Sequence, residues 1–510
     1  MSPKNANNRS LVPTQQDLDE FFDSTYQFGT ILLDREECPQ HFCFVAATGG
    51  GKTTYIRLLQ QDVMRGMRNE PDTRALIYDA KQDQQSILAG IDPGVRVVTF
   101  DPFDARGVAW DLAKDVCEPR VAIEIAYTLV PEAQESQPFF SGAVRHLLIG
   151  VMLSFMVRQL DWSLADVLRA MASPRKLRRV LAACKYSRGL IPKYFRDPKL
   201  LDNILSTIAT KLLPFEPIAA CWDSASEKIA LEDWIAGDYV LVLANSETSR
   251  HAIDALNRCI FKRAVDLHLN QSESTIRRTW WFLDEVSEAG RLEGLKSLLK
   301  RSRSKGGCVV LAFQTIEGLR DTKLYGPSET AEIIGQIGHK CIGRLECPET
   351  AEWASKLFGD REIRQVTNNK SWSSSSGKDG GSSSYSYTEN EQFVTQPSVL
   401  PSEFLSLPPC NDVNGLHAFS LSRSIGAFWS HSPGHELFEE ALLPKSTDVP
   451  DFVARSVESQ FLEPWTKDIA ILFAPPIRRK AKRSSESDQQ NKLETLKKLG
   501  EFFRDDGSGD

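Results

Sequence analysis

The sequence has 510 residues, 41% of them hydrophobic, which is enough chain for two or three domains with cores of their own. Its net charge of −7 excludes a protein that coats nucleic acid through overall positive charge, so a polyanion would have to meet a local patch or a channel. The ten cysteines are scattered without metal-ligand spacing, and neither a secretory signal nor a bilayer-spanning run occurs. We therefore expect a cytoplasmic protein without a transmembrane segment or a zinc site.

Residues 1–25 predict a loose lead-in, and the stretch His41–Thr54 predicts a phosphate-binding P-loop. A short apolar strand runs into three successive glycines, whose backbone N–H groups can converge on phosphate oxygens at the start of a helix. Lys52 would reach the β- and γ-phosphates of ATP, and the hydroxyl of Thr53 would bind Mg²⁺. Ala46 stands where the usual pattern has its first glycine. The predicted nucleotide-binding residues are Thr48, Gly49, Gly50, Gly51, Lys52, Thr53 and Thr54.

The order of the elements predicts an α/β domain that an all-α segment interrupts. Apolar runs typical of parallel strands occur at 29–33, 42–46, 74–80, 95–100, 238–244, 279–285, 307–314 and 339–344, and two more at 415–420 and 424–429 would complete the sheet. Residues 115–235 instead show helical periodicity punctuated by prolines. We interpret 26–114 and 236–435 as one nucleotide-binding domain and 115–235 as an inserted all-α domain, because this segment is too long for ordinary crossover helices.

Polar side chains at two strand ends suggest the chemistry of the site. Asp284 and Glu285 end an apolar strand, so Asp284 would hold Mg²⁺ and Glu285 would polarise the attacking water. Gln314 ends the next strand and is placed to sense the γ-phosphate or orient water. Acidic pairs and glutamines at strand ends are common, and it is the upstream P-loop that favours the catalytic interpretation.

The basic run Lys300–Lys305 has two interpretations. It can complement the negative end of a helix dipole, which alone would explain it. Alternatively, Arg303 is an arginine finger that reaches the nucleotide of a neighbouring subunit and stabilises the transition state in trans. The second interpretation requires a ring assembly.

Two later segments have low apolar content. Residues 370–388 are dominated by serine and glycine and predict a mobile surface loop. Residues 436–510 predict a C-terminal extension whose tail, from about 476, is disordered apart from one amphipathic helix over 492–503.

Four segments together resemble the coupling proteins of type IV secretion and conjugative DNA transfer. They are the P-loop Ala47–Thr53, the run Asp101–Arg106 followed by Trp110, the block from Phe282 to Gln314, and Pro348–Trp353 with Pro401–Pro408. The resemblance extends from about 40 to 430. It implies a RecA-like P-loop ATPase domain with a mainly parallel sheet and an inserted all-α domain. It also implies the stated roles for Lys52, Thr53, Asp284, Glu285 and Gln314, and it places Arg303 at the arginine-finger position.

The same resemblance implies a homo-hexameric ring that uses ATP and Mg²⁺ to move DNA, through sequence-independent backbone contacts, or a relaxase–DNA complex toward a secretion channel. Members of the family usually begin with two transmembrane helices, so this chain would dock at the inner membrane through a partner protein.

Two other functions remain open from the sequence. One is a soluble DNA-processing translocase that is not tied to secretion. The other is a nucleotide-gated adaptor that recognises cargo with little hydrolysis. A P-loop kinase or GTPase is disfavoured, because neither an Asn-Lys-x-Asp pattern nor an acceptor lid occurs.

Overall fold

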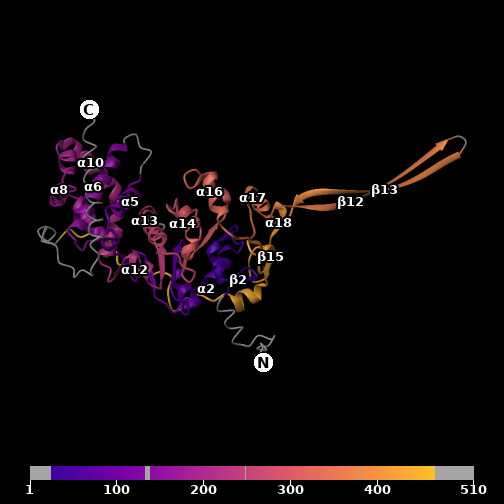
Figure 1. Ribbon diagram of the computed structural model, residues 1–510, viewed down its shortest axis with the longest axis horizontal. Helices are drawn as coiled ribbons and strands as arrows, with labels where there is room; N and C mark the ends of the chain where they lie inside the picture. The colour runs from indigo at the N-terminus through magenta and orange to yellow at the C-terminus, as the bar shows by residue number, and fades with distance from the viewer. Residues whose placement is uncertain (1–24, 132–137, 247, 378–379, 466–510) are drawn as a thin grey trace, which may run out of the picture.

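A computed structural model describes residues 25–131, 138–246, 248–377 and 380–465, and Figure 1 shows the arrangement of its elements. A nine-stranded sheet lies at the centre, with the order β15-β14-β11-β3-β10-β9-β4-β8-β5. The strands are β3 (Phe42–Val45), β4 (Thr73–Asp79), β5 (Val97–Phe100), β8 (Val240–Ala244), β9 (Arg278–Leu283), β10 (Gly307–Phe313), β11 (His339–Ile342), β14 (Leu416–Ser422) and β15 (Gly426–Ser432).

The strands from β11 to β5 are all parallel, and β14 and β15 add an antiparallel edge. Every residue of β9 and β10 is buried, as expected for parallel strands covered on both faces. Successive side chains enter different cores, so that Trp280 packs with the residues on one face and Trp281 with those on the other. The predicted α/β fold with a mainly parallel sheet is confirmed.

Helices cover both faces of the sheet. One core includes side chains of α2 (Lys52–Gly66) and α3 (Gln84–Ile91). The other core includes side chains of the remaining helices of the domain. These helices are α12 (Leu231–Ala236), α13 (Arg250–Leu269), α14 (Leu295–Arg301), α15 (Ile316–Arg320), α16 (Gly326–Gly335), α17 (Pro348–Phe358) and α18 (Pro401–Ser406). Before the P-loop, β1 (Thr25–Phe28) and β2 (Ile31–Asp34) form a separate antiparallel pair.

Between the short parallel strands β6 (Ala109–Trp110) and β7 (Lys228–Ile229), the described residues fold only into helices. They are α4 (Leu112–Asp115), α5 (Pro119–Leu129), α6 (Pro138–Val157), α7 (Leu164–Met171), α8 (Pro174–Ala183), α9 (Leu190–Tyr194), α10 (Pro198–Leu212) and α11 (Glu216–Asp223). Asp115 closes the base of this segment, because its carboxylate accepts hydrogen bonds from Trp110 Nε1 at 2.5 Å and from the backbone N–H of Leu231 at 2.8 Å. Burial raises the pKa of Asp115 to about 6.

Two helical stretches in the insertion are long and apolar enough to cross a bilayer by composition. The first is α6, but 72% of its apolar window is buried, and it forms the core around which the other helices pack. The second, Pro198–Asp223, is 44% buried and is interrupted by a 3₁₀ turn at Leu213–Phe215. A core helix of a bundle passes the same test of length and composition as a membrane span, and for α6 the burial explains its apolar sequence.

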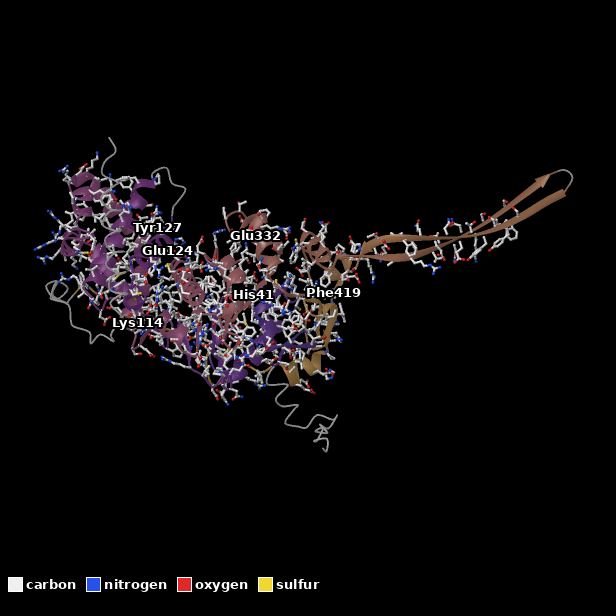
Figure 2. The ribbon with its side chains drawn as sticks, viewed as in Figure 1. His41, Lys114, Glu124, Tyr127, Glu332 and Phe419 are labelled. Atoms are coloured by element: carbon white, nitrogen blue, oxygen red, sulfur yellow. The ribbon has the colours of Figure 1, made fainter. Side chains whose placement is uncertain are left out.

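Residues 370–388, predicted as a mobile surface loop, belong to a regular hairpin. β12 (Asp360–Gly377) and β13 (Gly380–Pro397) form an antiparallel hairpin that projects from the body, and Figure 2 shows its side chains clear of the rest of the molecule. Low apolar content excludes a packed core, but it does not exclude a ribbon with regular backbone pairing. Trp372 pairs directly with Tyr385, and serine hydroxyls on facing strands lie 2.6 and 2.7 Å apart, which supports the register.

The C-terminal strap, defined here as residues 436–465, crosses the body from the P-loop helix to the insertion. It starts with a π-helical turn, Glu436–Ala441, whose last carbonyl accepts a hydrogen bond of 2.7 Å from Gln61 of α2. The backbone N–H of Arg455 then donates to the carbonyl of Phe103 at 2.9 Å. At its far end the carbonyl of Glu463 accepts from Arg169 Nε at 2.9 Å. The predicted lead-in up to residue 24 and the tail after residue 465 lie outside the described residues.

Candidate nucleotide site at the P-loop

The P-loop has the backbone shape that an anion site requires. Gly49 and Gly51 have φ angles of 73° and 89°, in the left-handed region that glycine adopts without strain. α2 begins at Lys52 without a side-chain cap, so the N–H groups of its first turn remain available to an anion. The loop is fixed from outside because the N–H of Ala47 donates to the carbonyl of Arg344 at 2.8 Å.

Ala46, the departure from the usual pattern, is accommodated by two glycines. Its methyl group would lie only 3.0 Å from a Cβ at Gly50 and 3.1 Å from a Cβ at Gly343, and neither atom is present. A Cβ at Gly343 would also come within 2.6 Å of the carbonyl of Gly50. The extra methyl therefore occupies space that Gly343 leaves open, and the loop keeps its shape.

Charged side chains from the start of α2 and from the ends of β4 and β9 converge on this loop. Lys52 forms an ion pair with Glu285, and its Nζ lies 3.6 Å from Asp284 Oδ1. Lys81, which follows β4, donates to Thr53 Oγ1 at 2.7 Å and lies 3.8 Å from Asp284 Oδ2. The ammonium group of Lys81 thus lies between the two predicted Mg²⁺ ligands, which shows that their oxygens can share one cation.

Glu285 is held in an unusual conformation directly after β9. Its φ angle of 61° is rare for a non-glycine residue, and such strained backbone typically occurs at functional sites. Its carboxylate accepts hydrogen bonds from Ser287 Oγ at 2.7 Å and from Gln314 Nε2 at 3.0 Å. Burial alone would raise the pKa of Glu285, but the charge of Lys52 and these hydrogen bonds outweigh it and hold the pKa below its usual value.

The predicted residues that line one cavity of about 420 Å³ are Thr48, Gly49, Gly51, Lys52, Thr53, Thr54, Glu285 and Gln314. Asp284 adjoins the cavity through its ion pairs with Lys52 and Lys81, whereas Arg303 does not lie there. Thr48 Oγ1 donates to Gln314 Oε1 at 3.4 Å, and the Thr54 hydroxyl lies 3.9 Å from Cys410 Sγ. Asp284 Oδ1 is buried and has no hydrogen-bond partner among the described residues. Among the described residues its one charged contact is the 3.6 Å ion pair with Lys52, and a buried carboxylate oxygen without a hydrogen bond fits a ligand of a hydrated metal ion.

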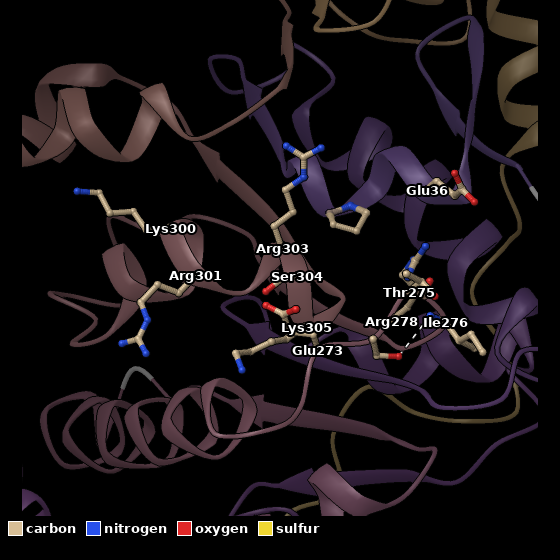
Figure 3. A pocket seen from close by; sticks show the side chains of 12 residues that line it. Glu36, Glu273, Thr275, Ile276, Arg278, Lys300, Arg301, Arg303, Ser304 and Lys305 are labelled. Atoms are coloured by element: carbon tan, nitrogen blue, oxygen red, sulfur yellow. Dashed lines mark hydrogen bonds between the residues drawn. The ribbon is translucent and has the colours of Figure 1, made fainter.

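Arg303 is at the opposite edge of the sheet. It precedes β10, whereas Gln314 follows it, and seven strand residues separate the two edges by about 20 Å. Arg303 is exposed and lines an open pocket of about 1080 Å³ (Figure 3). Figure 3 also shows Lys300 and Arg301 directed to a different side of that pocket. One chain therefore does not bring Arg303 to its own P-loop.

The sequence argument missed Lys81, Glu288, Cys410 and Phe438, which line the cavity, and Ser287, which donates to Glu285 beside it. Lys81 could have been found, because it lies in the polar segment after β4 that was expected at this edge of the sheet. Ser287 follows the acidic pair by two residues, but no pattern marks it. Cys410 and Phe438 reach the cavity from segments after the parallel strands, and only the folded chain shows this proximity.

The fold and the loop define an α/β P-loop protein with a nucleotide site at the carboxyl edge of a mainly parallel sheet. Residues 25–421 match the family described as type IV secretion-system coupling protein DNA-binding domain, and the chain belongs to this family. The resemblance stated from the sequence is thereby confirmed. The coupling protein TraD of Escherichia coli (strain K12) is 22% identical over 424 residues, which cover 76% of this chain and 55% of TraD. The chain thus spans about half the length of that relative.

Solved structures of a bacterial conjugative coupling protein, TrwB, share the RecA-like fold. The unbound monoclinic form of TrwBdeltaN70 superposes with a TM-score of 0.64 at 17% identity, covering 84% of this chain and 91% of TrwBdeltaN70. The complex of TrwB with ADP and Mg²⁺ gives a TM-score of 0.62 at 18% identity, covering 87% of this chain and 96% of TrwB.

Proposed function

We propose that this chain is an ATP-hydrolysing motor that assembles into a hexameric ring and moves DNA, or a relaxase–DNA complex, toward a type IV secretion channel. The observation that carries the proposal is that Lys52, Thr53, Glu285 and Gln314 line one cavity at the P-loop, with Asp284 Oδ1 3.6 Å from Lys52 Nζ. Membership in the coupling-protein family, and the nucleotide complexes of TrwB, support the same conclusion.

In this proposal the α2 N-terminus and Lys52 hold the triphosphate. Lys52 is now neutralised by Asp284 and Glu285, and a phosphate would compete for its ammonium group. That exchange leaves the carboxylate of Glu285 to accept a proton from water, with Gln314 orienting it. Bound Mg²⁺ would be held by Thr53 and Asp284, where Lys81 now lies, and would neutralise charge on the phosphate oxygens.

Arg303 acts on a neighbouring subunit in this proposal. It is exposed at the amino edge of the sheet and has no ion pair among the described residues, so its guanidinium is available to another chain. A ring in which the amino edge of one subunit meets the carboxyl edge of the next would place Arg303 against a γ-phosphate. Such a contact in trans makes hydrolysis depend on assembly.

DNA would meet the inserted helices through a basic cap. Residues 172–200 contain nine Lys or Arg and one acid, in a chain with a net charge of −7. We define the basic cap as the exposed cations Arg175, Arg178, Arg179, Lys185, Arg188, Arg196 and Lys199. No ion pair within the described residues neutralises any of them. In Figure 1, α8 and α10 lie at the end of the molecule opposite the hairpin, and such a local patch suits the phosphate backbone.

The decisive measurement is ATP hydrolysis by the purified chain with and without DNA, over a protein concentration series. A motor predicts turnover that DNA stimulates and that rises cooperatively with protein. Glu285→Gln should abolish turnover while nucleotide binding remains, because the substitution removes the base and keeps the side-chain volume. Turnover that is indifferent to DNA in the wild type, or unchanged by Glu285→Gln, would favour the cargo adaptor.

A further inference from the structure

The nucleotide cavity has one wall that the P-loop chemistry does not use. On one side of the cavity are Gly49 and Gly51 of the loop, Lys52 and Glu285. Cys410 and Phe438 line it from segments that follow the parallel strands. The backbone N–H of Cys410 donates to the carbonyl of Gly49 at 2.8 Å, so this wall is attached directly to the P-loop.

Phe438 is held at this wall by the C-terminal strap. Its neighbour Leu437 is 1% exposed and belongs to the core that includes α2, which fixes the turn Glu436–Ala441 against the body. Directly after the turn, the N–H of Leu443 donates to Gln61 Oε1 at 3.1 Å, and Arg57 Nη2 donates to the carbonyl of Leu443 at 2.7 Å. The helix that carries the phosphate-binding N-terminus therefore also positions Phe438.

The aromatic side chain of Phe438 is partly exposed at the cavity. Phe438 is 37% exposed, whereas Leu437 in the same turn is buried, although an aromatic ring gains free energy when it leaves water. Among the described residues that line the cavity, it is the one aromatic side chain. The cavity of about 420 Å³ has the size of sites that take nucleotide-sized molecules, so space remains beside the phosphates.

We propose that Phe438 is the stacking surface for the base of the nucleotide whose phosphates the P-loop holds. This inference rests on the proposed nucleotide site and adds the residue that recognises the other end of the ligand. The free energy of stacking on a ring face depends on the area of the stacked rings rather than on particular substituents. The contact thus favours purine over pyrimidine nucleotides without reading the exocyclic groups. Phe438 lies beyond residues 25–421, which match the family, on the C-terminal strap.

The test compares two ligands that share phosphates and differ in the base. Titration calorimetry with Mg²⁺ would measure the binding of ADP and of inorganic tripolyphosphate to the full chain. Phe438→Ala should lower the affinity for ADP about tenfold, because it removes one base–aromatic contact, and should leave the affinity for tripolyphosphate unchanged. In the same variant, the affinity for UDP should fall less than the affinity for ADP. Phe438→Tyr should retain the affinity for ADP, which shows that the ring and not the fold is responsible.

Phe452 supplies the matched control. It lies on the same strap, is 40% exposed and does not line the cavity, so Phe452→Ala should leave both ligands unaffected. Equal loss of ADP and tripolyphosphate in Phe438→Ala, or no loss of ADP, would overturn the inference while the nucleotide site stands. If Lys52→Ala instead leaves both ligands bound, the phosphate site is wrong, and the proposed function fails together with this inference.

Discussion

The two edges of the central sheet carry opposite kinds of charge arrangement. At the carboxyl edge, two lysines and two acids neutralise one another around the P-loop, as Lys52 and Lys81 contact Asp284 and Glu285. At the amino edge, Arg303 is exposed beside an open pocket and has no acidic partner among the described residues. The first arrangement is a site that is complete except for its ligand. The second is a cation without a counterpart.

This difference suggests what each edge needs. In the proposed function, the carboxyl edge supplies the base, the phosphate-binding lysine and the metal ligands, and the transition state would still gain from one more positive charge. The amino edge offers that charge, but about 20 Å of sheet separates it from the chain's own site. Contact between unlike edges of two copies would satisfy both, and repeated head-to-tail contact closes into a ring.

The largest expected effect comes from removing the lysine of the carboxyl edge. Lys52→Ala leaves Asp284 and Glu285 as a partly buried pair of like charges and removes the cation that binds phosphate. Nucleotide affinity should fall at least about a hundredfold, and hydrolysis should be abolished. Lys300 at the other edge is already paired with Glu332, so Lys300→Ala should change neither quantity. If Lys52→Ala still binds nucleotide, the proposed nucleotide site at the carboxyl edge is wrong.

The next largest effect tests whether the amino edge of one subunit contacts the carboxyl edge of the next. Arg303→Ala should lower DNA-stimulated turnover about a thousandfold while nucleotide binding remains, because a trans contact acts only in the transition state. Arg301→Ala is the matched control, since its side chain points to a different side of the pocket in Figure 3.

Mixing two inactive variants separates action in trans from action in cis. Arg303→Ala subunits keep an intact P-loop site, and Glu285→Gln subunits keep the arginine, so mixed assemblies contain some complete interfaces. Partial turnover should therefore return on mixing. It should not return when the Arg303→Ala chain is mixed with a chain that carries both substitutions. Absence of recovery in the first mixture would contradict the meeting of unlike edges.

The sequence predicted the carboxyl edge well, because that edge is made by local patterns. Asp284 and Gln314 end apolar runs, and the carboxyl ends of parallel strands come together at one edge of a sheet. The segment after β4 could have placed Lys81 at this edge, but it could not have predicted that its ammonium group lies between Thr53 and Asp284.

Long-range packing and backbone pairing were harder to predict. The strap brings Phe438 back to α2 across more than 370 residues of sequence, and nothing in its composition marks that contact. The hairpin was not predicted, for a different reason. Its alternation of Trp372, Tyr385 and serines satisfies strand pairing without a core, whereas the prediction considered only the lack of apolar residues.

A moderate effect is expected when the DNA contact is weakened and both edges remain intact. Substituting Arg175, Arg178 and Arg179 of α8 by alanine should reduce DNA affinity and flatten its dependence on salt, by up to about 0.9 in the logarithmic slope for each lost phosphate contact. Turnover without DNA should be unchanged. The control removes Arg96 and Lys228, which are exposed but already paired with Glu227 and Asp161. An unchanged salt slope in the α8 variant would exclude the basic cap as the DNA surface.

The smallest effect concerns the departure in the P-loop itself. Ala46→Gly restores the usual pattern, yet nucleotide affinity should change by less than about twofold, because the methyl group fills space beside Gly50 and Gly343 without distorting the loop. Gly343→Ala should be more harmful, since its Cβ would come within 2.6 Å of the carbonyl of Gly50 and force the loop to move. Nucleotide titration of the two variants compares them directly. A tenfold or greater gain in nucleotide affinity in Ala46→Gly would contradict this expectation. It would show that the methyl group strains the P-loop and lowers its affinity for the nucleotide.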